Sequence, residues 1–134
     1  MAARVLRWEG ARDTRVELAL LDAPAMRRLN RRATGRRGLT DVIAFSLAQP
    51  DGRVLGDVYI CPAAAGAFVM GGHSSDRPTA RPPDRLREEL VRLAVHGTLH
   101  VLGYDHPEGA NRMRSAMWRR QERYVRRLVS RKTR

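Results

Sequence analysis

The chain has 134 residues, of which 43% are hydrophobic and 30% are charged. This length and apolar content predict one folded domain with its own core and exclude an intrinsically disordered chain. The formal net charge of +12 favours a polyanionic partner such as nucleic acid or an anionic membrane surface.

The single cysteine, Cys61, excludes an internal disulfide and a cysteine-based zinc cluster. The first ten residues lack the apolar segment of a signal peptide, and no apolar run approaches the roughly 18 residues of a membrane span. We therefore expect a cytoplasmic protein that does not enter the membrane.

The first part of the chain predicts a strand, a helix and a basic loop. Residues 16–21 (VELALL) favour a strand. Asp22 can cap the helix that follows, with Pro24 in its first turn and Met26 facing inward. Residues 31–38 (RRATGRRG) predict a basic loop.

A β-hairpin is expected next. Residues 41–48 and 54–61 favour two antiparallel strands, joined by the turn at residues 49–53. Residues 62–70 favour a short helix. Residues 71–83 are rich in Gly, Ser and Pro and predict a loop.

The second half of the chain predicts two long helices. The first is capped by Asp84, runs to about Leu102 and ends at Gly103, a residue that favours a helix C-terminus. The second spans about 108–128 and precedes a basic tail, 130–134. The residues expected to face the core at helical spacing are Leu86, Leu90, Leu93, Gly97, Met113, Met117, Tyr124 and Leu128.

Strands in the first half and helices in the second predict the α+β class, with a small mixed β-sheet packed against helices. We expect a single domain, 1–129, followed by the tail at 130–134. The density of arginines on the last helix exceeds what solvation needs and favours RNA contact there.

Three of the four histidines lie in one short segment, HGTLHVLGYDH, at residues 96–106. His96 and His100 are four residues apart on a predicted helix, so their imidazoles lie on one face. Gly103 ends this helix and lets His106 fold back toward them. The spacing predicts one zinc ion at the end of a central helix. Three protein ligands favour a catalytic site over a structural one, which usually has four.

Other interpretations of this segment remain open. Asp105 or Cys61 can in principle supply a fourth ligand. The histidine spacing also matches the metzincin zinc-peptidase signature, H-E-x-x-H-x-x-G-x-x-H, except that Gly97 replaces the glutamate that serves as general base. A zinc peptidase is therefore the weaker alternative.

The same segment closely resembles the YbeY family signature H-G-x-L-H-L-x-G-Y-D-H, differing only at Val101. Two upstream blocks add to the resemblance. Residues 29–45 (LNRRATGRRGLTDVIAF) resemble L-N-x-x-Y-R-G-x-D-x-P-T-D-V-L-S-F, and residues 55–61 (LGDVYIC) resemble L-G-D-I-x-I-C. The three blocks follow the family order over most of the chain.

The resemblance implies a zinc-dependent, single-strand-specific endoribonuclease. Its expected roles are 3′-end maturation of 16S ribosomal RNA and ribosome quality control, with ribosomal RNA and the small ribosomal subunit as partners. It also implies that His96, His100 and His106 are the zinc ligands and the catalytic residues.

The chain departs from the family in the second block. A Tyr-Arg pair, whose arginine matters for function in the family, aligns with Ala33 and Thr34. This departure keeps a non-catalytic RNA-binding ribosome-assembly factor with a metal site as an alternative. The basic residues that flank the gap are the candidate RNA phosphate contacts: Arg31, Arg32, Arg36 and Arg37.

Overall fold

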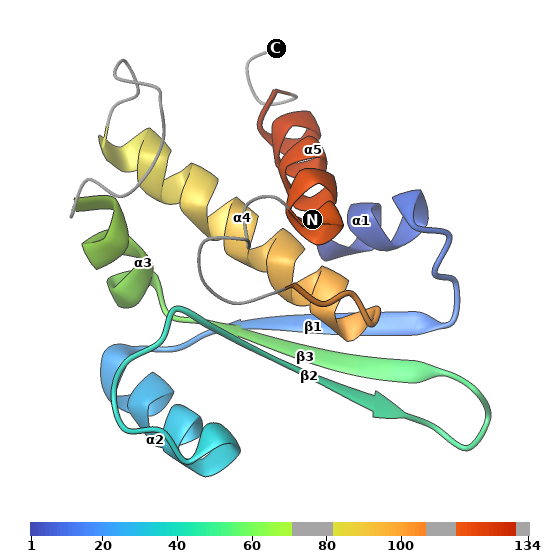
Figure 1. Cartoon of the computed structure of the whole chain (residues 1–134), viewed down its shortest axis with the longest axis horizontal. Helices are drawn as coiled ribbons and strands as arrows, with labels where there is room; N and C mark the ends of the chain where they lie inside the picture. Colours follow the sequence, from blue (N-terminus) through green and yellow to red (C-terminus); the bar gives the residue numbers. More distant parts are fainter. Residues whose placement is uncertain (71–81, 107–114, 131–134) are drawn as a thin grey trace.

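The computed structural model describes residues 1–70, 82–106 and 115–130 (Figure 1). Most of the expected loop at 71–83, the first part of the last predicted helix and nearly all of the predicted tail lie outside these ranges. The helices and strands, in chain order, are α1 (Ala2–Trp8), β1 (Thr14–Leu20), α2 (Ala23–Thr34), β2 (Val42–Ala48), β3 (Val54–Ile60), α3 (Pro62–Met70), α4 (Pro82–Val101) and α5 (Ala116–Ser130).

The three strands form one mixed sheet in the order β1-β3-β2. β1 pairs with β3 in parallel, and β2 pairs with β3 antiparallel. The turn between β2 and β3 closes with a hydrogen bond from the Gln49 N–H to the Arg53 carbonyl, 2.7 Å long. The predicted hairpin and the predicted α+β class with a small mixed sheet are thus confirmed.

Helix α4 crosses one face of this sheet and is buried on two sides (Figure 1). One side packs on the strands through Leu93 and Val101, which cluster with Val58. Another side, which includes Val95, packs against the buried face of α5. Since successive residues of a helix are about 100° apart, His96 and His100 lie on a third side of α4, between these two contacts.

Two glycines let α4 approach the sheet closely. A Cβ atom at Gly97 would overlap the side chain of Val58, and a Cβ atom at Gly56 would overlap the side chain of Val101. Gly97 therefore has a packing role, as its predicted core position indicated. The close approach fixes the height at which α4 carries its histidines above the strands.

Helix α2 begins as predicted and ends later than predicted. The Asp22 carboxylate accepts a hydrogen bond from the Ala25 N–H at 2.9 Å, which confirms it as the N-cap. The expected loop at 31–38 is wrong for its first four residues, because they continue the helix to Thr34. Arginine and alanine are good helix formers. Gly35, at φ 71°, supplies the left-handed C-cap.

The later helices differ from the prediction at their ends. Asp84 does not cap α4; it lies in the first turn of a helix that begins at Pro82. Proline fits this position because its fixed φ is helical and it needs no N–H partner there. Ser130, expected in the tail, is the last residue of α5. Within the ranges that the structure describes, no helix is long and apolar enough to cross a membrane.

Candidate metal centre

The three histidines of the motif converge in space. One ring nitrogen from each of His96, His100 and His106 can be chosen so that all three lie within 4.8 Å of one another. The Nε2 atoms of His96 and His100 are 3.0 Å apart. In tetrahedral zinc sites with Zn–N bonds of about 2.0–2.1 Å, ligand nitrogens are roughly 3.4 Å apart. The cluster therefore has the dimensions of a site for a single metal ion.

The end of α4 brings His106 back to the other two histidines. Gly103 adopts a φ of 97°, which a residue with a side chain rarely adopts. The Tyr104 N–H then donates to the Leu99 carbonyl at 3.0 Å, a bond that closes the helix end and reverses the chain. Asp105 accepts a hydrogen bond from the His106 N–H at 2.8 Å, so its carboxylate holds this turn.

The second nitrogen of each α4 histidine is anchored. His96 Nδ1 lies 2.7 Å from Oε1 of Gln121, and His100 Nδ1 lies 3.0 Å from the Tyr104 carbonyl. Both partners are acceptors, so both Nδ1 atoms carry the proton. The two Nε2 lone pairs then face each other, which is unfavourable unless a cation lies between them. This donor set fits a divalent metal such as zinc.

Gln121 is a residue of this centre that the sequence analysis missed. It is 1% exposed and occupies the buried face of α5, with Met117 and Val125 among its neighbours on that face. A signal was present in the sequence: a glutamine within the apolar stripe of an amphipathic helix must find a buried hydrogen-bond partner. The stripe alone does not name that partner, since His96 is 25 residues away.

Glu9 links the turn at Gly103 and Tyr104 to two helices. The sequence did not predict this role either. Its carboxylate accepts hydrogen bonds from the Tyr104 hydroxyl at 2.9 Å and the Tyr124 hydroxyl at 2.7 Å, and it pairs with Arg120 at 3.1 Å. Burial alone would raise the pKa of Glu9, but these hydrogen bonds outweigh it and lower the pKa below its usual value.

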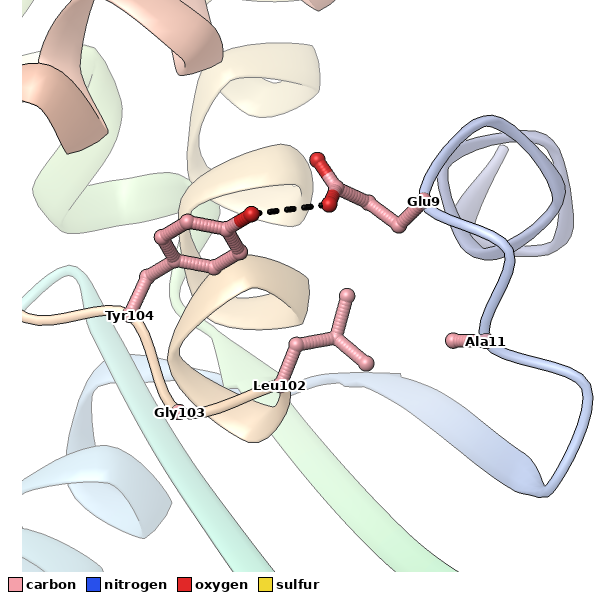
Figure 2. Close-up of a pocket in the computed structure, with 5 residues that line it drawn as sticks. All are labelled: Glu9, Ala11, Leu102, Gly103 and Tyr104. Carbon is pink, nitrogen blue, oxygen red and sulfur yellow. Dashed lines mark hydrogen bonds between the residues drawn. The ribbon is translucent and has the colours of Figure 1, made fainter.

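A pocket of about 270 Å³ opens beside this turn, lined by Glu9, Ala11, Leu102, Gly103 and Tyr104. Figure 2 shows the Tyr104 hydroxyl pointing at the Glu9 carboxylate across it. No histidine lines this pocket, so it is separate from the histidine cluster. The cluster itself is bordered by the start of α5, through Ser115, Met117, Trp118 and Gln121.

A partly buried ion network joins α4 to α5. Arg92 reaches Glu89 at 2.8 Å and Glu88 at 3.1 Å on α4, and Glu122 at 2.7 Å on α5. Glu89 is 5% exposed, and burial raises its pKa although Arg92 opposes the shift. The network fixes the spacing of the two helices that hold His96 and Gln121.

The candidate fourth ligands lie outside the cluster. In the described part of the chain, the group that converges on the site contains the three histidines only. Cys61 is buried just after β3, and the Asp105 carboxylate is engaged with the His106 backbone. Three ligands from protein leave room for a further ligand, which is the pattern of catalytic zinc sites.

The four arginines proposed as phosphate contacts lie away from the histidine cluster. Arg31 and Arg32 are in α2, Arg36 and Arg37 follow it, and all four are exposed. In Figure 1, α2 lies below the strands, whereas α4 and α5 lie above them. Thr34 donates its hydroxyl proton to the Asn30 carbonyl at 2.8 Å.

Known proteins resemble the chain in sequence and fold. A family model described as "Endoribonuclease YbeY" matches residues 2–129. A Desulfitobacterium hafniense protein of that name is 39% identical over 124 residues, covering 84% of this chain and 70% of its own. A Micrococcus luteus protein of that name is 35% identical over 123 residues, covering 85% and 70%.

A solved structure shares the fold. The solution structure of TM1509 from Thermotoga maritima superposes with a TM-score of 0.60 at 23% sequence identity. The likeness covers 96% of this chain and 83% of that one. It supports the arrangement of the sheet and helices that positions the histidines.

Proposed function

This chain belongs to the YbeY endoribonuclease family, and on that premise we propose that it is a zinc-dependent endoribonuclease that cleaves single-stranded RNA. Its proposed roles are the 3′-end maturation of 16S ribosomal RNA and ribosome quality control, in the cytoplasm and with the small ribosomal subunit as partner. The proposed catalytic unit is the single domain expected at residues 1–129.

The observation that carries this proposal is the convergence of His96, His100 and His106, with Nε2 atoms of the first two 3.0 Å apart. These three residues are the proposed zinc ligands and catalytic residues. A bound Zn²⁺ ion would supply Lewis acidity, which stabilises the negative charge that develops on a phosphodiester during hydrolysis.

The chain's own residues prepare the site for this chemistry. Gln121 and the Tyr104 carbonyl hold the rings of His96 and His100 with Nε2 turned inward, so the lone pairs are aligned before metal binding. The turn at Gly103 carries His106 to the same point. The proposed RNA contacts away from the centre are the exposed arginines of α2 and the segment after it: Arg31, Arg32, Arg36 and Arg37.

A peptidase is disfavoured by the packing of Gly97. In zinc peptidases with this histidine spacing, the residue after the first histidine is the glutamate general base. Here that position faces Val58 of the sheet, and even a Cβ atom would overlap the valine. A carboxylate therefore has no route from this position to the histidines.

The test uses a labelled single-stranded RNA that ends with the 3′ end of 16S ribosomal RNA. We expect the untreated protein to cleave it, and we expect no cleavage after chelation or by His100→Ala. Circular dichroism establishes that the variant is folded, and the chelator arm does not depend on the variant. RNA that is bound but uncut in every arm would favour a non-catalytic ribosome-assembly factor, and casein cleavage would favour a peptidase.

A further inference from the structure

The solvent face of α5 is a row of arginines. Arg119, Arg123 and Arg126 are exposed and, at spacings of four and three residues, project from one side of the helix. The opposite side is buried and includes Met117, Gln121, Val125 and Leu128. The exposed row is therefore a stripe of positive charge along the outside of the molecule.

No acidic residue of α5 balances this stripe. The helix contains a single carboxylate, Glu122, and that carboxylate is held by Arg92 of α4. The two other arginines of α5 face α1: Arg120 pairs with Glu9, and Arg127 lies over the Trp8 ring at 4.1 Å. Like charges four residues apart destabilise a helix, so the row carries an energetic cost that a bound polyanion would relieve.

The row lies on the helix that borders the histidine cluster, on the side of that helix turned away from the cluster. Ser115, Met117, Trp118 and Gln121 of the α5 N-terminal region border His96 and His106, and Arg119 directly follows Trp118. With a rise of about 1.5 Å per residue, Arg126 lies roughly 10 Å further along the axis than Arg119. One helix thus turns Gln121 inward to a proposed metal ligand and its arginine row outward, away from the centre.

We propose that Arg119, Arg123 and Arg126 form a phosphate-binding surface that holds the single-stranded RNA flanking the cleavage position. Guanidinium groups pair with phosphate oxygens in a bidentate way and carry no sequence information from the bases. The affinity of this surface for RNA therefore depends on how many phosphates of the strand it contacts and not on the base sequence of the RNA. This inference rests on the proposed ribonuclease function.

The test compares two triple variants that remove the same charge. One changes Arg119, Arg123 and Arg126 to Gln, and the control changes Arg12, Arg15 and Arg87, exposed arginines outside α5, to Gln. Binding of a fluorescent single-stranded RNA to chelated protein is measured by anisotropy across a salt series. Chelation prevents metal-dependent cleavage, so binding is read alone.

The row variant is expected to bind at least about tenfold more weakly than the control at low salt. Each phosphate that the protein no longer neutralises makes the plot of log K against log salt less steep by about 0.7, so three phosphates reduce the slope by about 2. Equal binding and equal slopes in the two triple variants overturn the proposal. Thermal unfolding of both variants is measured as well, and a row variant at least as stable as the control excludes a folding defect as the cause.

This binding experiment, combined with the cleavage assay on metal-loaded protein, separates this inference from the function it rests on. Intact protein that binds RNA through the row yet never cleaves it contradicts the ribonuclease and leaves the binding surface in place. Intact protein that cleaves in a metal-dependent way, with a row variant that binds like the control, contradicts the surface and leaves the ribonuclease in place.

Discussion

The histidine centre and the basic segment at 31–37 are built in different ways. The centre depends on hydrogen bonds between parts of the chain that are far apart: His96 to Gln121, and Glu9 to Tyr104 and Tyr124. The basic segment and its surroundings depend on short-range bonds, such as those from the Thr34 hydroxyl to the Asn30 carbonyl and from the Arg36 N–H to Thr34.

This difference separates a preorganised site from an adaptable one. The His96 imidazole is oriented by the buried Gln121 and the His100 imidazole by the Tyr104 carbonyl, so little ordering of these two rings remains for metal binding to accomplish. The arginines are exposed on long side chains and can follow the shape of an RNA. Substitutions at the centre should therefore lower metal affinity strongly. Substitutions in the basic segment should lower RNA affinity only mildly, and that effect should depend on salt.

The largest effect is expected from His106→Ala, which removes the ligand supplied by the turn after α4. Loss of a residue that only hydrogen-bonds to a metal ligand lowers metal affinity by about 10- to 100-fold. Removal of a ligand itself should therefore lower the affinity by about 100-fold or more. Competition with a zinc-binding dye measures this. His73→Ala, which changes the one histidine outside the motif, is the control and should keep one equivalent of zinc at unchanged affinity.

Gln121→Leu tests whether a distant residue prepares the centre. We expect zinc affinity to fall by about 10- to 100-fold, because His96 Nδ1 loses its buried acceptor. Gln121→Glu keeps an acceptor oxygen and should retain most of the affinity. Wild-type zinc affinity in Gln121→Leu would contradict the role given to this hydrogen bond.

Gly97→Ala tests the close approach of α4 to the sheet. The added Cβ overlaps Val58, and overpacking of this kind costs about 1–3 kcal/mol of unfolding free energy. Gly66→Ala in α3 is the matched control, since its Cβ would meet only Leu86 at an ordinary 3.9 Å. Urea unfolding should show the first variant destabilised and the second at least as stable as the wild type.

Glu9 makes the turn before His106 sensitive to acid. Folding lowers the Glu9 pKa from its ordinary value of 4.5, so the folded state binds this proton less readily than the unfolded state. The stability that the ionised Glu9 carboxylate contributes is present above pH 4.5 and is lost as the pH falls through the lowered pKa of Glu9. Urea unfolding of Glu9→Gln should therefore vary less with acid pH than the wild type. Glu17→Gln, at an exposed position on β1, should behave like the wild type.

The smallest effect is expected when Arg31, Arg32, Arg36 and Arg37 are changed together to Gln. RNA affinity should fall several-fold, with a salt slope less steep by about 0.7 for each phosphate no longer bound, and zinc affinity should not change. A loss of zinc binding in this variant would show that the two regions are coupled and would end the distinction between them.

The sequence predicts what short-range patterns determine. The i, i+4 spacing and the glycine bend placed three histidines together, and the turn at residues 49–53 between two strand-like runs placed the hairpin. Partners that depend on tertiary packing were missed: Gln121, and Glu9 at the end of α1. Helix α1 itself has seven residues, too few to show a helical period. The end of α2 was misplaced because arginine-rich residues before Gly35 favour a helix as readily as a loop.

Zinc-edge X-ray absorption on protein loaded with one equivalent of zinc tests the three-histidine centre most directly. We expect three imidazole nitrogens at about 2.0–2.1 Å and a fourth, oxygen ligand that comes from solvent. A sulfur ligand near about 2.3 Å, which would come from Cys61, would contradict it, and so would a shell with fewer than three imidazoles.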